Sequence, residues 1–490
     1  MASNSDQIVQ HLQHDFQALV AYVTGPEARV QTAYTVELTL FRRLLALGAT
    51  LLRLFFVTRA AVRPSGTVTG SDGTPLTYHD QRPTTYYSVF GKVRFWRHYF
   101  TARGQAGHCP LDAELSLPVR CYSDLLREWA VYGATDEAYR ESRTALEHIL
   151  GLPLSLQALE TGVAEAGQDV ANFYEQLAEP IALPAVGTIL VVQADGKGVP
   201  MVQLPTRKPP MRLGKGQKRT KKKEAVVTGL YTIAPYPRTP QEVVAALLQD
   251  PDGRAPGARP VPVGKELRAT LEGKAVAMAR LVKRAAPRDG PHIQARVALT
   301  DGAEALQQQL LARFPKHTLV LDIIHATEYL WDAANALLGD THRHRTAWVR
   351  SYLEALVAGQ TEAVLTALEA EANDPTCTGT QRHAVRRTLG YDRRNRPYMH
   401  YDEYLAQGWP IGTGVIEGAC RHLVKDRMEQ SGMRWTKTGA QAVLDLRAVR
   451  LNGQWEAYWQ FHRHQQHRRL YGMLAQVPEA AEAQALTLAA

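Results

Sequence analysis

The sequence has few cysteines and none of the spacings that hold structural metals. Its 490 residues include four cysteines, which are far apart and form no CxxC pair: Cys109, Cys121, Cys377 and Cys420. A zinc site or a disulfide framework is therefore not expected, and a reducing cytoplasm is the predicted setting. The polar opening MASNSDQIVQHLQHD is not typical of a secretory signal. No GxxxxGK[ST] motif occurs, so an ATP-driven motor is not expected.

Long hydrophobic runs are also scarce. The apolar stretch at residues 44–57, LLALGATLLRLFFV, is short and contains Arg53. A membrane-crossing helix needs about 20 apolar residues, so this stretch predicts a buried amphipathic helix and no membrane partner. The surrounding residues 5–60 have helical periodicity and could pack as a bundle or pair between subunits.

Acidic residues are missing from one strongly basic segment. Residues 207–223, RKPPMRLGKGQKRTKKK, contain nine basic side chains and no acidic one, in a chain of net charge +9. Such a segment can be a solvated loop or a sorting tract, but its place just after an apolar run favours contact with phosphates of double-stranded DNA. The expected DNA contacts here are Arg212, Lys215, Lys218, Arg219, Lys221, Lys222 and Lys223.

Three acidic residues lie in contexts that suit metal binding. Asp195 ends the run TILVVQADG, and Asp301 ends QARVALTDG. These patterns predict buried strands that stop at a turn, whereas Glu417, in GTGVIEGACRHLVKDRMEQ, is predicted on a helix. A single Asp-Gly is usually only a turn. Three converging carboxylates, however, can hold two Mg²⁺ ions, or Mn²⁺ in their place, for phosphodiester chemistry.

Other residues are expected near these carboxylates. Asp322 and His325 end the next apolar run, LDIIHATEYLW, and Asp322 is the alternative to Asp301 as the second metal carboxylate. Arg421 and Lys425 follow Glu417 at four and eight residues, so they are expected on its helix face, beside phosphate.

Two C-terminal motifs leave alternatives open. Arg434 and Trp435 are expected DNA contacts, although a core role for Trp435, anchoring the preceding helix, is the favoured interpretation from the residues. The segment from His462 to His467, HRHQQH, could bind metal, but a solvated basic helix is the favoured interpretation.

The order of these patterns predicts an α/β fold with a ribonuclease-H-like mixed-sheet core. Strands in succession are followed by strand, helix and strand, and 115 residues then separate Asp301 from Glu417, which implies a helical insertion. Within residues 122–178, Ser155 caps a helix in a weak helix-turn-helix pattern. That helix carries Glu160, Glu165 and Asp169 and no basic residue, so packing is as plausible as DNA reading.

The predicted regions follow from these boundaries. They are an N-terminal helical region (1–60), a small β-containing region with a hairpin around Gly91 (61–120), a helical region suited to DNA binding or packing (121–182), the core with the first two acidic residues (183–330), the helical insertion (331–408), the helix carrying Glu417 (409–435), and C-terminal helices with a tail (436–490).

Several segments together resemble the bacterial insertion-sequence transposases of the ISKra group. They include YYSVFGKVRFWRHYF, VVQADGKGVPM, RLGKGQKRTKKKEAVVTGLYTIAPYPRTP, LTDGAEAL and GTGVIEGACRHLVKDRMEQSGMRW. The resemblance implies a DDE transposase in which Asp195, Asp301 and Glu417 form the acidic triad. It implies metal-dependent strand cleavage and strand transfer on terminal inverted repeats and target DNA. The protein would then be nucleoid-associated and at least a homodimer on DNA.

Two other classes remain open from the residues. One is an inactive or domesticated DNA-binding protein, and the other is a structure-specific ribonuclease-H-like nuclease. The intact acidic triad argues against a pure DNA binder, because a protein that only binds phosphates gains nothing from three carboxylates facing them.

Overall fold

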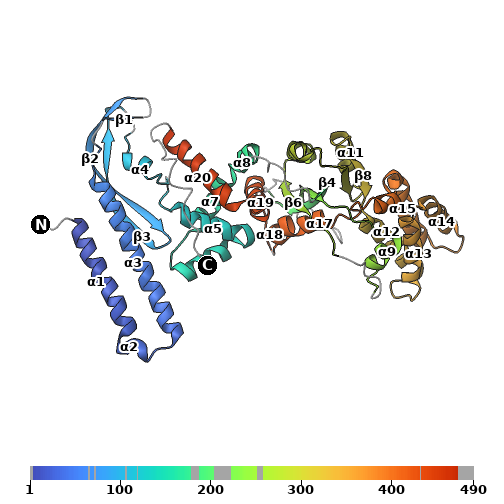
Figure 1. Cartoon of the computed structure of the whole chain (residues 1–490), viewed down its shortest axis with the longest axis horizontal. Coiled ribbons are helices and arrows are strands. Elements are labelled where there is room, and N and C mark those ends of the chain that lie inside the picture. The colour runs from blue at the N-terminus through green and yellow to red at the C-terminus, as the bar shows by residue number, and fades with distance from the viewer. Residues whose placement is uncertain are drawn as a thin grey trace, which may run out of the picture. The chain divides into compact units, whose positions relative to one another are not determined.

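The chain forms two compact units, which are described separately. A computed structural model describes residues 4–64, 67–70, 73–104, 107–118, 120–177, 187–203, 222–250, 258–430 and 432–472. Unit 1 comprises residues 1–174 and 455–490, and unit 2 comprises residues 175–454 (Figure 1). The predicted C-terminal region 436–490 is therefore divided, because its first helix belongs to unit 2 and its second helix returns to unit 1.

Unit 1 begins with a helical hairpin and a small antiparallel sheet. Its strand order is β1-β2-β3, and the predicted hairpin is confirmed by the pairing of Ser88 with Gly91, whose φ is +129°. Phe56 stacks on Phe95 at 4.2 Å and so joins the third helix to the sheet. The elements are α1 (Asn4–Thr24), α2 (Pro26–Arg29), α3 (Ala33–Ala61), β1 (Val68–Thr69), β2 (Pro75–Ser88), β3 (Gly91–Thr101) and α4 (Pro110–Glu114).

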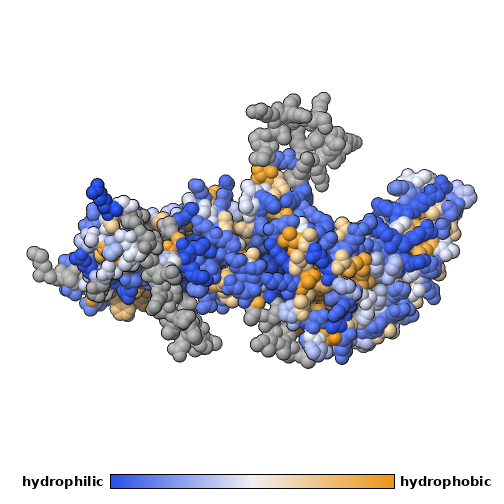
Figure 2. Space-filling model, turned by 90° about the horizontal axis from the view of Figure 1, so that it is seen from above, coloured by the Kyte–Doolittle hydropathy of each residue, from blue (hydrophilic) through white to orange (hydrophobic). Residues whose placement is uncertain are grey.

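The α3 helix is largely exposed, so the prediction of a buried helix was wrong. Among its residues only Phe56 is buried, while Phe41, Leu44 and Leu51 are 40–53% exposed. Among the described helices, α3 is long and apolar enough to cross a membrane by length and composition, and 6% of its most apolar window is buried. The face drawn in Figure 2 is mostly hydrophilic and is interrupted by apolar patches, as is usual for a protein surface.

The rest of unit 1 is helical and includes the returning C-terminal helix, α20 (Trp455–Tyr471). The other helices are α5 (Asp124–Asp136), α6 (Tyr139–Leu150), α7 (Leu156–Gly167) and α8 (Val170–Gln176). Ser155 caps α7 as predicted, accepting from the Ala158 amide at 3.0 Å. Glu165 pairs with Arg127 at 2.6 Å, and Asp169 accepts from His462 Nδ1 at 2.7 Å. These contacts favour packing over DNA reading for α7.

The histidines of α20 do not lie on a solvated face. His462 is 1% exposed and bonded to Asp169, and His467 is 7% exposed with its Nδ1 3.0 Å from Ser116 Oγ. The favoured interpretation, a solvated basic helix, was therefore wrong at these two positions. Their polar atoms join α20 to segments some 300 residues earlier in the chain.

Unit 2 is an α/β structure built on a five-stranded mixed sheet. The strand order is β6-β5-β4-β7-β8; β4, β7 and β8 are parallel, and β5 is antiparallel to both of its neighbours. The strands are β4 (Ile189–Pro200), β5 (Lys222–Ile233), β6 (Val263–Thr270), β7 (Ala295–Thr300) and β8 (Thr318–Leu321). The helices are α9 (Pro240–Leu247), α10 (Lys274–Ala285), α11 (Glu304–Arg313), α12 (Ile323–Leu338), α13 (Arg345–Val357), α14 (Thr361–Asn373), α15 (Gly379–Asn395), α16 (Tyr401–Ala406), α17 (Gly414–Ala419), α18 (Asp426–Met428) and α19 (Lys437–Leu451).

Helices cover both faces of this sheet. Successive residues of a strand point to opposite faces, and in β4 Ile189 and Val191 enter one core while Leu190 and Val192 enter the other. The first core contains α12 to α16, and the second contains α10 and α11. The predicted helical insertion is thus helical, but it shares one core with the sheet.

A buried carboxyl in α15 makes the stability of unit 2 depend on pH. Asp392 is 0% exposed, neither of its carboxyl oxygens has a hydrogen-bond partner, and burial raises its pKa to about 8. The unfolded chain releases this proton near pH 4, so folding stability falls as pH rises from about 4 to 8. We expect Asp392→Asn to stabilise the protein by at least about 1 kcal/mol more at pH 8 than at pH 5. Thermal unfolding at both pH values measures this, and an equal effect at both would contradict it.

Candidate active site

Strand register aligns three aspartates at one edge of the unit 2 sheet. In the parallel pairs, Gln193 lies opposite Leu299, and Thr300 lies opposite Leu321. Continuing each strand in register places Asp195 beside Asp301 and Asp301 beside Asp322. Neighbours in register point to the same face of a sheet, so the three carboxylates share one side. The predicted strand end is confirmed at Asp301, which follows β7. The strand end predicted at Asp195 was wrong, because β4 continues past Asp195 to Pro200 in its pairing with β5.

Asp195 and Asp301 lie close enough for their charges to interact. Burial, together with the charge of Asp195, raises the pKa of Asp301, while the Ala303 amide, which donates to Asp301 Oδ1 at 2.9 Å, opposes this shift. Asp195 accepts from its neighbouring Gly196 amide at 2.5 Å. Two half-buried carboxylates that repel each other form a site that a cation would stabilise.

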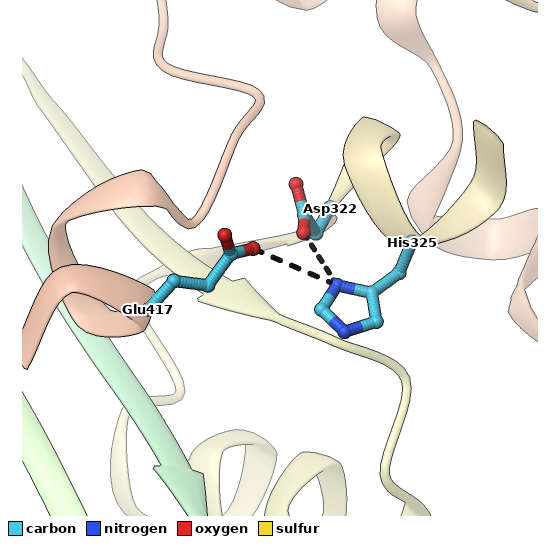
Figure 3. A group of neighbouring side chains, drawn as sticks. All are labelled: Asp322, His325 and Glu417. Carbon is cyan, nitrogen blue, oxygen red and sulfur yellow. Dashed lines mark hydrogen bonds and ion pairs between the residues drawn. The ribbon is translucent and has the colours of Figure 1, made fainter. Parts of the chain in front are cut away.

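Asp322, His325 and Glu417 form a second group beside them (Figure 3). Asp322 Oδ2 is 2.6 Å from His325 Nδ1, which lies 3.9 Å from Glu417 Oε1. The ligand atoms of the three residues all lie within 4.8 Å of one another, so this group could hold a metal ion. Among the described residues, the predicted set of Asp195, Asp301 and Glu417 does not meet that mutual distance.

The hydroxyl of Thr413 joins Glu417 to the strand edge. Thr413 Oγ1 lies 2.7 Å from Asp322 Oδ2 and 2.8 Å from Glu417 Oε1. A hydroxyl has one proton, so it can donate to only one of these two carboxyls. Burial raises the pKa of Glu417, whereas burial of Asp322 is outweighed by hydrogen bonds from His325, Thr413 and the Ile324 amide, which lower its pKa. Of the two carboxyls, Glu417 is therefore protonated more readily, which leaves the Thr413 hydroxyl to donate to Asp322.

Cys420 is a site residue that the sequence did not single out. It is 5% exposed, and its thiol donates to Asp195 Oδ2 at 3.2 Å. It begins a π-helical turn, Cys420–Lys425, directly after α17. Such wide turns recur at functional sites, and this one links the Glu417 helix to the strand of Asp195. The sequence signal that could have identified Cys420 was its position three residues after Glu417.

Among the described residues, no contact joins Glu417 to the cations expected beside it, Arg421 and Lys425. Arg421 and Lys425 are exposed, and the contact described for Arg421 is with Asp426, at 3.9 Å. The hydrogen bonds from side chains described for Glu417 and Asp195 come instead from Thr413 and Cys420. The expected common face assumed an uninterrupted α-helix, which the π-helical turn interrupts.

The other predicted DNA contacts have mixed surroundings. Lys222 pairs with Glu429 at 2.5 Å, Lys223 is partly exposed, and Arg434 is exposed. Trp435 is 7% exposed and donates to the Met428 carbonyl at 3.1 Å, so it is a core residue and its ring is not open for base stacking. The remaining basic positions lie outside the described residues: Arg212, Lys215, Lys218, Arg219 and Lys221.

The helical insertion supports the Asp301 turn. Tyr391 donates to the Asp301 carbonyl at 2.8 Å, and Arg394 donates to the Gly302 carbonyl at 2.9 Å. Gly302 has φ +88°, and a Cβ there would meet the Tyr391 ring at 2.8 Å, so only glycine fits. Both supporting side chains come from α15, about 90 residues later in the sequence.

Fold and site together define an α/β protein with an acidic strand edge suited to cations. No protein-family model matches the chain. The chain is similar to the "UPF0236 protein in vanSb 3'region" of Streptococcus gallolyticus, with 22% identity over 406 residues, covering 78% of this chain and 75% of that protein. The matched length exceeds unit 2 alone, which spans residues 175–454. That name states no activity.

Proposed function

We propose that this protein is a DNA transposase that cleaves and joins DNA strands through a DDE site in a ribonuclease-H-like core. The observation that carries the proposal is the register of β4, β7 and β8, which lines up Asp195, Asp301 and Asp322 at one edge. Glu417 lies beside that edge on α17. The sheet order β6-β5-β4-β7-β8, with an antiparallel second strand, is the order expected of such a core and supports the proposal.

The donor set at this edge fits hard divalent cations. Asp195, Asp301 and Glu417 offer carboxylate oxygens, which Mg²⁺ and Mn²⁺ prefer. Mutual repulsion between Asp195 and Asp301 gives an energetic reason for a cation between them. When bound there, two Mg²⁺ ions would lower the pKa of an attacking water or 3′-hydroxyl and stabilise charge on the phosphate and leaving oxygens.

The chain's own residues hold these ligands in place. The Cys420 thiol orients Asp195, and the Ala303 amide orients Asp301. Thr413 fixes Glu417 relative to the strand edge. Ligands that are positioned before substrate arrives need not reorganise during the reaction, and this lowers the barrier for an in-line displacement.

Basic charge supports DNA as the partner. The net charge of +9 favours a polyanion, and the segment 207–223 directly follows the strand that carries Asp195. Phosphate contacts by lysine and arginine release counterions, so binding should weaken steeply as salt concentration rises.

Cleavage of the element's own ends tests the proposed function. Purified protein is incubated with labelled duplex carrying the sequences that flank its gene, with Mg²⁺ or with EDTA, beside Glu417→Ala. We expect Mg²⁺-dependent cleavage at the ends that the variant has lost. Tight end binding without cleavage would indicate a DNA-binding protein, and cleavage without end preference would indicate a structure-specific nuclease.

A second copy of the chain is the proposed occupant of the exposed side of α3. Its exposed apolar residues follow the 3-4 spacing of a helix-pairing seam: Tyr34, Phe41, Leu44, Leu51 and Phe55. The charges of the hairpin are also complementary between copies. The α3 helix carries four arginines and one glutamate, whereas α1 carries two aspartates and no lysine or arginine.

Disrupting this seam should abolish self-association. We expect wild-type protein to be a dimer by light scattering and Phe41→Glu/Leu44→Glu to be a monomer with unchanged far-UV circular dichroism. Gln10→Glu/Gln17→Glu, at exposed polar positions of α1, should remain dimeric. A wild-type protein that is monomeric in solution would contradict the seam. Binding of the wild-type protein to lipid vesicles would indicate that the exposed side of α3 contacts a membrane surface instead.

A further inference from the structure

Asp322 precedes α12 and is fully enclosed at the sheet edge. It is 0% exposed, and its two oxygens accept four hydrogen bonds. Oδ1 accepts from the amides of Ile324 and Thr413, each at 3.1 Å. Oδ2 accepts from the Thr413 hydroxyl at 2.7 Å and from His325 Nδ1 at 2.6 Å. An ionised carboxylate has about four acceptor positions, so a cation could bind Asp322 only by displacing one of these donors.

The same bonds fix the orientation of the His325 ring. Because Nδ1 is bound to Asp322, the other ring nitrogen, Nε2, is the atom left for a substrate or water. In Figure 3, Nε2 points away from both Asp322 and Glu417. The side chain of His325 is 29% exposed, so the ring is partly open to solvent. His325 and Asp301 are also close enough for their charges to interact, so the ring lies beside the carboxylates of the proposed reaction centre.

We propose that His325 is a further substrate-contacting residue, which binds an oxygen of the reacting phosphodiester through Nε2, and that Asp322 is its positioning residue and not a metal ligand. The inference rests on the proposed function, because it needs a phosphodiester at the strand edge. By distance alone, Asp322, His325 and Glu417 could bind one metal ion together. The proposal gives these three residues different roles. Glu417 remains a metal ligand, Asp322 holds His325, and Thr413 couples the two carboxyls.

Two substitutions of His325 separate contact from structure. The amide of asparagine occupies the position of Nδ1 and can keep the bond to Asp322, whereas the amide of glutamine reaches the position of Nε2. In single-turnover cleavage of end-bearing duplex at saturating protein, we expect His325→Asn to be about 100-fold slower than wild type, the size expected for loss of one preorganised donor. We expect His325→Gln to be at least about ten times faster than His325→Asn, with DNA affinity similar in all three proteins.

The outcomes discriminate clearly. Wild-type cleavage by His325→Asn, or a glutamine variant slower than the asparagine variant, would make His325 a structural partner of Asp322 and overturn the inference. If wild-type protein itself failed to cleave end-bearing DNA, the proposed function would fail and the inference with it. Circular dichroism and thermal unfolding of each variant confirm that the compared proteins are folded.

Manganese binding tests the role of Asp322 independently of cleavage. Calorimetric titration of Mn²⁺ into wild-type protein, Asp322→Asn and Asp195→Asn counts the ions bound per chain. We expect Asp322→Asn to keep the wild-type number and Asp195→Asn to lose at least one ion. Loss of an ion in a folded Asp322→Asn protein would make Asp322 a ligand and overturn its positioning role. Thr413→Ser, which keeps the hydroxyl, serves as a second folded comparison at the same contact.

Discussion

Replacing Asp301 by asparagine is expected to lower the rate of DNA cleavage by at least about 1000-fold, or about 4 kcal/mol of transition-state stabilisation. The substitution removes the charge of a proposed metal ligand but keeps the side-chain carbonyl oxygen that accepts from the Ala303 amide. In metal-free protein the same change should raise the unfolding temperature, because burial and the charge of Asp195 disfavour the ionised Asp301 carboxylate. A residue whose neutralisation stabilises the fold while abolishing activity is retained for function.

A neighbouring glutamate provides the control for this experiment. Glu304 is exposed at the start of α11, three residues after Asp301, so Glu304→Gln changes the net charge by the same amount. We expect Glu304→Gln to cleave within a few-fold of wild type and to leave the unfolding temperature unchanged. Single-turnover cleavage and differential scanning calorimetry measure both effects. Substantial cleavage by folded Asp301→Asn would exclude Asp301 from the reaction centre.

Replacing Glu266 by alanine is expected to destabilise unit 2 by about 3–5 kcal/mol, because two enclosed arginines lose their common partner. Glu266 is 4% exposed and accepts from Arg284 at 2.9 and 3.1 Å and from Arg288 at 2.8 Å. These bonds join β6 to the end of α10 and the short helix after it. A charge left without its partner in a buried site costs more than a surface pair ever contributes.

An exposed ion pair nearby gives the comparison for Glu266. Glu272 pairs with Arg280 at 2.5 Å, and both side chains are 31–40% exposed. We expect Glu272→Ala to cost less than about 1 kcal/mol. Urea unfolding followed by hydrogen exchange in β5 and β6 reports on this part of unit 2. Equal effects of the two substitutions would mean that burial does not determine how much the ion pairs of Glu266 contribute to the free energy of unfolding.

The strands of the candidate site were predictable from the sequence, and so was the end of β7 at Asp301. The apolar, β-branched run and the turn that follows it lie within nine residues, so they carry local information. The end of β4 was not predictable in this way, because pairing with β5 carries that strand past Asp195. The α/β character of unit 2 followed from the same runs. Asp322 was recognised in the same way, directly after β8, whereas His325, predicted at the same strand end, lies in the first turn of α12.

The contacts between these elements were not predictable, because they join distant parts of the chain. The hydrogen bond from the Thr413 amide to Asp322 spans 91 residues, and that from Cys420 to Asp195 spans 225. Periodicity gives each element but not its partner, which depends on how the sheet and helices pack. The same limit explains why the burial predicted for α3 and the exposure predicted for the histidines of α20 were wrong. Composition indicates an apolar or a basic helix, but it does not indicate what covers that helix.

Strand transfer is the measurement that tests the central claim most directly. A duplex ending in the 3′-hydroxyl of the element's own terminus is incubated with supercoiled plasmid, Mg²⁺ and either wild-type protein or Glu417→Gln, without ATP. The account predicts covalent joining of that terminus to the plasmid by the wild type alone, with no joining of a scrambled terminus. Plasmid cleavage without joining, or no reaction by a folded protein that binds the terminus, would contradict it.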